Sequence, residues 1–124
     1  MDYDILTAQY KSNLHKNERE MDELLSLKRK LEDERQDISE WKRHEAAHCN
    51  QRQNELHDKG AKQYLQALEK STNFTVDNCK RMERILEQGL EEIARKRKQL
   101  SAERETLQSE YRREVRNINK GGIG

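Results

Sequence analysis

The sequence contains no proline, only five glycines and two cysteines, and aromatic residues make up 5% of it. Hydrophobic residues occupy 31% of the 124 positions, which is too few to build the core of a compact enzyme domain of this length. Disordered chains and linkers are usually enriched in proline and glycine, so the scarcity of both argues against disorder. The remaining composition, with 40% charged residues, is typical of long helices.

Charges of the two signs nearly cancel, because 25 Lys and Arg face 24 Asp and Glu to give a net charge of +1. No global field therefore draws the chain to nucleic acid or to an anionic membrane. The start, Met1-Asp2-Tyr3-Asp4, is acidic where a signal peptide is basic, and no apolar run is long enough to span a membrane. We expect a cytoplasmic protein with no nucleic-acid partner and no membrane insertion, whose Cys49 and Cys79 are reduced.

Apolar residues recur with heptad spacing in each half of the chain, which predicts two long amphipathic helices. The first stripe includes Tyr3, Leu6, Tyr10, Leu14, Met21, Leu24, Leu27, Leu31, Ile38 and Trp41. The second includes Val76, Met82, Leu86, Leu90, Ile93, Leu100, Leu107 and Tyr111. Polar residues such as Asn17 and Glu34 stand at positions of the first stripe, so the seam between the helices is expected to be hydrated and imperfect.

Between the stripes, the segment 56–61 interrupts the apolar spacing and holds Gly60, the first glycine of the chain. Asp58 is a competent helix N-cap, and glycine is the usual residue just beyond a helix end. We therefore predict an all-α fold, a coiled-coil-like antiparallel hairpin over residues 1–120 with helices at about 3–56 and 62–118, a turn at 57–61 and a flexible tail at 121–124. The alternative is one continuous helix, since an interior glycine costs only about 1 kcal/mol relative to alanine.

A fold at Gly60 brings the two stripes together. The expected apolar pairs include Tyr10 with Tyr111, Leu14 with Leu107, Leu31 with Leu90 and, one residue off, Trp41 with Cys79. The halves also carry opposite net charges, −3 over residues 1–60 and +4 over residues 61–124. Screening keeps such surface attraction weak, so it selects the orientation of the helices more than it stabilises them.

The segment His44-Glu45-Ala46-Ala47-His48 matches the H-E-x-x-H pattern of zinc hydrolases. Such an enzyme also needs a third ligand and a substrate cleft, and a long charged helix offers neither. We interpret the match as chance and keep a zinc hydrolase as a remote alternative. The basic run at residues 95–98 is flanked by glutamates and is interpreted as a salt-bridged surface. The sequence thus predicts no catalytic residues, no metal and no cofactor.

The stripes are wider than a single partner helix can cover. Leu24, Leu25, Leu27 and Leu31 spread over a broad arc of the first helix, and Ile5 and Ile85 widen the stripes elsewhere. A two-helix hairpin is only marginally stable by itself, so burial of this surface against further helices is expected. The sequence therefore predicts a helical binding partner.

In length, hairpin layout and heptad style, shown by residues 24–31 and 103–107, the chain resembles the ESX-like helical hairpins of Gram-positive type VII secretion. It is most similar to the small LXG-toxin-associated α-helical proteins, the Lap-type targeting factors. The chain departs from the family at the turn, where Asp58-Lys59-Gly60 replaces Trp-x-Gly. In the family, an export signal with an aromatic residue four positions before an acid follows the second helix. No such signal is visible there, because Tyr111 is followed by Val115 and Phe74 by Asn78.

The resemblance implies a non-enzymatic targeting factor or chaperone that binds the N-terminal helical domain of a secreted LXG toxin. A sister small helical protein would then supply the export signal, and the chain would be cytoplasmic or co-exported with the toxin. The alternative is a homo-oligomeric coiled coil, such as a homodimer, that acts as a scaffold or a stalk-like export adaptor.

Overall fold

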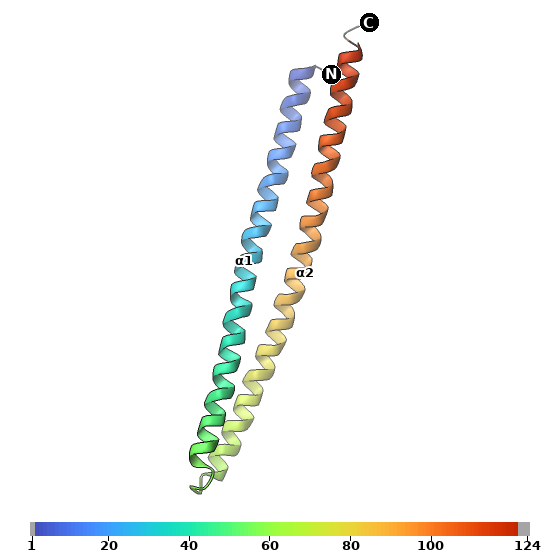
Figure 1. Cartoon of the computed structure of the whole chain (residues 1–124). Coiled ribbons are helices and arrows are strands. Elements are labelled where there is room, and N and C mark those ends of the chain that lie inside the picture. The colour runs from blue at the N-terminus through green and yellow to red at the C-terminus, as the bar shows by residue number, and fades with distance from the viewer. Residues whose placement is uncertain (1, 122–124) are drawn as a thin grey trace. The chain divides into compact units, whose positions relative to one another are not determined.

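The computed structural model describes residues 2–121, and over that range the chain forms two helices, α1 (Tyr3–Leu56) and α2 (Lys62–Gly121) (Figure 1). The two helices pack antiparallel as a hairpin, which confirms the predicted fold class and excludes one continuous helix. The bounds of α1 and the start of α2 agree with the prediction. Helix α2 continues to Gly121 instead of ending near residue 118, so Gly121 is not part of a tail. The rest of the predicted tail, 122–124, lies outside the described residues.

The long helices follow from the residues that are absent as much as from those present. Without proline, no position lacks a backbone donor or forces a kink, and the many Leu, Glu, Lys, Arg and Gln residues favour helix. The stretch 71–79 is rich in β-branched and hydrogen-bonding residues, yet it is helical throughout. Its Thr72 is buried, so tertiary packing outweighs the weak local propensity there.

The turn depends on Gly60, whose φ of +73° places it in the left-handed region. The Lys59 N–H donates to the Leu56 carbonyl at 3.0 Å, which closes the last turn of α1. The Leu65 N–H donates to the Ala61 carbonyl at 3.0 Å, so Ala61 stands at the N-cap of α2. Asp58 lies in the turn as predicted, but its predicted capping role is wrong. Residues 57–60 are needed to reverse the chain, and the Asp58 carboxylate instead lies 3.1 Å from His57 Nε2.

The hairpin divides into two compact units, each made of one segment from each helix. Unit 1 contains residues 2–28 of the N-terminal side with 91–121 of α2, and unit 2 contains Arg29–Leu90 with the turn. The core of unit 1 includes the buried Ile93 and Leu100, and that of unit 2 includes the buried Cys49 and Cys79. Each unit has the small core that a single pair of facing helices can provide.

Replacing Gly60 tests the turn. The change Gly60→Ala adds a Cβ that meets nothing within 4 Å, so its effect isolates the backbone conformation. A left-handed conformation costs an L-residue about 1–2 kcal/mol, and we expect a loss of that size in the free energy of unfolding, measured by urea denaturation. The matched control is Gly121→Ala, which also meets no atom within 4 Å but has no positive φ. Equal stabilities of the two variants would contradict the role of Gly60 in the turn.

Candidate partner-binding surface

The predicted stripe residues divide into three groups by exposure. Ile93 and Leu100 are buried. The half-buried group comprises Leu6, Tyr10, Leu14, Met21, Leu24, Leu31, Ile38, Val76, Leu86, Leu90, Leu107 and Tyr111. The exposed group comprises Tyr3, Leu27, Trp41 and Met82. The stripe pattern therefore does not separate the residues that are covered from those that face solvent.

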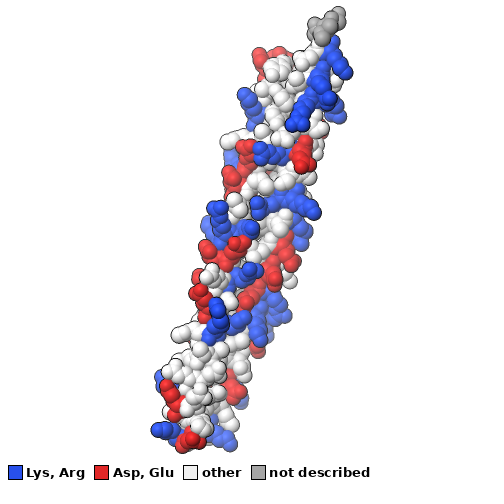
Figure 2. All heavy atoms as spheres, viewed as in Figure 1, with Lys and Arg blue, Asp and Glu red and all other residues white. Residues whose placement is uncertain are grey.

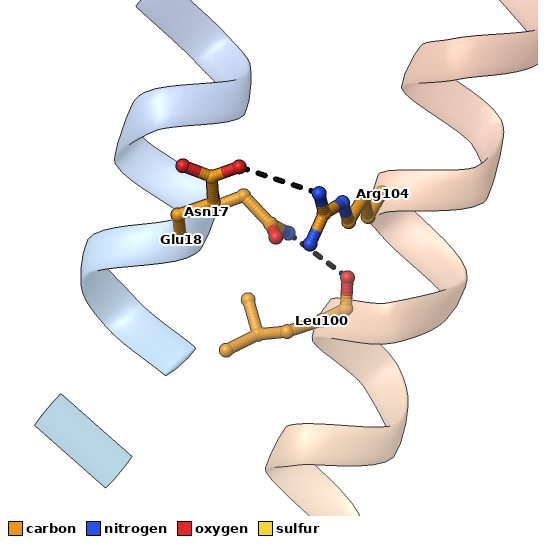
Figure 3. A network of polar contacts seen from close by, with 4 residues as sticks. All are labelled: Asn17, Glu18, Leu100 and Arg104. Carbon is orange, nitrogen blue, oxygen red and sulfur yellow. Dashed lines mark hydrogen bonds and ion pairs between the residues drawn. The ribbon is translucent and has the colours of Figure 1, made fainter. Parts of the chain in front are cut away.

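A polar contact lies inside the seam of unit 1 (Figure 3). The Asn17 side chain is 3% exposed, and its Nδ2 donates to the Leu100 carbonyl at 2.9 Å. Its Oδ1 is buried and accepts no hydrogen bond from any residue among 2–121. Beside it, Arg104 of α2 reaches Glu18 of α1, with Nη2 and Oε1 3.3 Å apart. Asn17 is thus shielded from bulk solvent, and its contact with Leu100 favours the observed register of the two helices.

Near the start of α1, Tyr10 stacks on Tyr111 with 4.2 Å between the ring centroids. This confirms the pair that the hairpin register predicted. The Tyr111 hydroxyl also lies 3.0 Å from Thr7 Oγ1. Its hydrogen bond with Thr7 lowers the pKa of Tyr111, and a hydrogen bond with Tyr3 and the charge of Lys11 act in the same direction while burial opposes them. The hydroxyls therefore join the two helices beside the stacked rings.

Unit 1 carries a groove of about 440 Å³, which we call the unit 1 groove. It is lined by Glu20, Glu23, Leu24, Leu27, Lys96, Gln99, Leu100 and Glu103. The three leucines give it an apolar floor, and Leu27 remains 44% exposed. Helix α1 contributes Glu20, Glu23, Leu24 and Leu27 through the spacing of three and four residues that places side chains on one face. The groove is open at the surface and presents leucine side chains that the hairpin leaves uncovered.

In unit 2, Lys42 Nζ and Glu83 Oε1 lie 2.7 Å apart across the two helices. The preceding Trp41, which the register places near Cys79, is only partly covered. The indole is more than half exposed, and its Nε1 donates to Glu45 Oε1 at 3.2 Å on the same helix. An indole is too large for one facing helix to cover completely, whereas the small Cys79 side chain is fully buried.

Further large apolar side chains are exposed, two of which, Ile5 and Ile85, widen the stripes as predicted from the sequence. They are Ile5, Tyr64, Phe74 and Ile85, and Phe74 and Ile85 are the most exposed, at 69% and 66%. Tyr64 and Phe74 are not among the predicted stripe residues, and their sequence signal is a large apolar residue outside the heptad stripe of a charged helix. Figure 2 shows acidic and basic side chains interspersed with uncharged surface on the visible face. Exposed hydrophobic residues in this number indicate that the protein has a binding partner.

The H-E-x-x-H match and both cysteines lie within the described part of the chain. His44 and His48 are both exposed on α1. Within residues 2–121, no group of three or more His, Cys, Asp or Glu is placed to hold a metal ion. Cys49 and Cys79 are free thiols, and both are buried. The Lys96 ammonium lies 3.4 Å from Glu92, one of the pairs expected around the basic run.

Comparisons with known proteins identify no relative. No protein-family model matches the sequence, and no curated protein and no solved structure is significantly similar to it. In the described part of the chain, neither helix contains a segment apolar enough to cross a bilayer. The residues themselves, and the resemblance in layout to the type VII secretion hairpins, are therefore the basis for the functional proposal.

Replacing Asn17 with leucine tests the polar contact in the seam. The change Asn17→Leu removes a buried carbonyl oxygen that has no hydrogen-bond donor, so we expect the free energy of unfolding to rise by about 1 kcal/mol. We also expect a less specific register, because buried asparagines fix register at a cost in stability. Denaturation and disulfide cross-linking at engineered cysteines measure the two effects. The control is Asn13→Leu at an exposed position, and a drop in stability for Asn17→Leu would contradict the interpretation.

The ion pair of unit 2 makes a second stability prediction. Both side chains of the Lys42–Glu83 pair are only 25% exposed, and their 2.7 Å contact joins the two helices. We expect Glu83→Gln to lower the free energy of unfolding by about 0.5–1 kcal/mol, with a smaller loss at high salt. The control Glu92→Gln removes the more exposed pair with Lys96 within α2 and should change stability by less than about 0.5 kcal/mol. Equal losses in the free energy of unfolding for Glu83→Gln and Glu92→Gln would show that the contact between helices stabilises the protein no more than the exposed pair does.

Proposed function

We propose that the protein is a non-enzymatic helical binding partner that packs its uncovered apolar residues on the helices of another protein. The observation that carries this proposal is the imbalance between buried and exposed side chains. The buried hydrophobic residues are Cys49, Cys79, Ile93 and Leu100, two of them small thiols. Among residues 2–121, eight larger hydrophobic residues are exposed: Tyr3, Ile5, Leu27, Trp41, Tyr64, Phe74, Met82 and Ile85.

The free energy available from covering this surface favours association. Each square ångström of apolar surface removed from water contributes about 25 cal/mol, so burial of several such side chains can offset the entropy lost on binding. A long helix with apolar positions at heptad spacing fits best against other helices, whose ridges and grooves have the same repeat. The partner is therefore a helical domain.

We further propose, from the resemblance to LXG-associated hairpins, that this partner is the N-terminal helical domain of a secreted LXG toxin in Gram-positive type VII secretion. In this role the protein is a targeting factor or chaperone that acts in the cytoplasm, and a sister hairpin carries the export signal. The antiparallel hairpin layout of the chain supports this proposal.

Co-purification tests the proposal. A tagged N-terminal helical domain of an LXG toxin encoded in the same genome is produced together with this protein and with its sister hairpin. We expect a stable complex with the unmodified chain. The exposed substitutions Ile5→Ser and Phe74→Ser should each reduce the recovered complex several-fold, because each removes apolar surface that only a partner can cover.

The control is Ala8→Ser, a small polar change at an exposed position one turn from Ile5. It should leave the complex unchanged, and circular dichroism should show the same helix content in all variants. Failure of the unmodified chain to bind any of the LXG domains would end the toxin assignment. Binding that neither Ile5→Ser nor Phe74→Ser weakens would contradict the assignment of these exposed residues to the partner interface.

A further inference from the structure

The unit 1 groove combines an apolar floor with carboxylates that have no partner. Glu20, Glu23 and Glu103 stand around the leucine floor, and all three are exposed. Among residues 2–121, none of them makes an ion pair or a side-chain hydrogen bond. The one cation in the lining, Lys96, is already engaged by Glu92. The groove is therefore suited to an apolar side chain that arrives with positive charges beside it.

Unit 2 presents a surface of the complementary kind on α2. Met82 and Ile85 are 49% and 66% exposed, and they lie one helical turn apart. Arg81 and Arg84 flank them at spacings of one to four residues, so we call these four residues the Ile85 patch. Neither arginine pairs with a carboxylate among the described residues. The Arg84 Nε donates only to the Lys80 carbonyl of its own helix, at 3.4 Å.

We propose that two copies of this chain associate by seating the Ile85 patch of one copy in the unit 1 groove of the other. Ile85 and Met82 then cover Leu24 and Leu27, while Arg81 and Arg84 face Glu20 and Glu23. Two observations favour a second copy as the occupant. The apolar residues of one surface can face the apolar residues of the other. The unpaired charges are carboxylates at the groove and arginines at the patch, so they are opposite in sign.

The contact joins two different surfaces, which has a consequence for assembly. Such a contact closes into a pair only when it is made twice, once in each direction, and otherwise continues from copy to copy. The apolar part supplies the affinity, and the charges select the partner and the orientation. This inference goes beyond the proposed function, since it concerns the purified chain alone and requires no toxin.

The test is sedimentation velocity of the purified full chain over a range of concentrations. We expect reversible association that weakens as salt is raised. Reversing the groove with Glu20→Lys and Glu23→Lys, or the patch with Arg81→Glu and Arg84→Glu, should weaken self-association at least tenfold. An equimolar mixture of the two variants should associate again, because each intact surface, and each reversed surface, meets a complementary one.

The matched control carries Glu91→Lys and Glu105→Lys, which make the same charge change at exposed positions outside the groove. It should associate as the unmodified chain does. Circular dichroism checks that every variant is folded, and Ile85→Ser tests the apolar contact without any change of charge. A chain that stays monomeric at all concentrations overturns the proposal. So does association that neither reversed variant weakens, or a mixture that fails to restore it. Toxin binding is measured separately, so the failure of either proposal is distinguishable from that of the other.

Discussion

The constraint on which this protein depends is that two facing helices can bury only the narrow seam between them. A side chain at the seam is covered by a single neighbouring helix, so the residues that become fully buried are few, and they include the small thiols Cys49 and Cys79. Larger residues that extend the stripe sideways, such as Leu27, stay in contact with water. The same constraint that limits the core therefore creates the surface available for binding.

Apolar packing in so narrow a seam does not define which residues of the two helices lie opposite each other. Polar contacts define this register. Leucine stripes with a seven-residue repeat match one another at several offsets, so apolar packing alone does not select one. The buried Asn17 amide bonds the Leu100 carbonyl, and Lys42 meets Glu83 at 2.7 Å in the other unit. A shift of either segment breaks a buried or half-buried polar contact, which costs more free energy than a change of leucine neighbours. Each unit thus holds a polar contact that specifies its own pairing.

The sequence predicted those features that local chemistry decides. The bounds of α1, the start of α2, the turn at Gly60 and the Tyr10–Tyr111 pair followed from heptad spacing, the missing prolines and the first glycine. It did not predict that Asn17 is buried or that Trp41 is more than half exposed, because both depend on how closely the facing helix approaches at that position. The sequence predicted Asp58 as the N-cap of α2, but Ala61 takes this position, because the length of the turn and not capping preference sets where α2 begins. The heptad spacing does not indicate which protein the hairpin binds, so the proposal for the partner depends on the chemistry of the exposed surface.

Specificity for such a surface must come from charge, since leucine covers leucine equally well on many helices. Exposed ion pairs add little affinity in water, but a carboxylate that is left unpaired in a contact opposes it. Glu20, Glu23 and Glu103 around the unit 1 groove therefore reject a helix with an acidic flank more effectively than they attract one with a basic flank. The chain has 25 basic and 24 acidic residues, so its net charge of +1 does not reveal this local excess of carboxylates at the groove. The pattern of unpaired charges beside exposed leucines thus determines which helices this hairpin can accept.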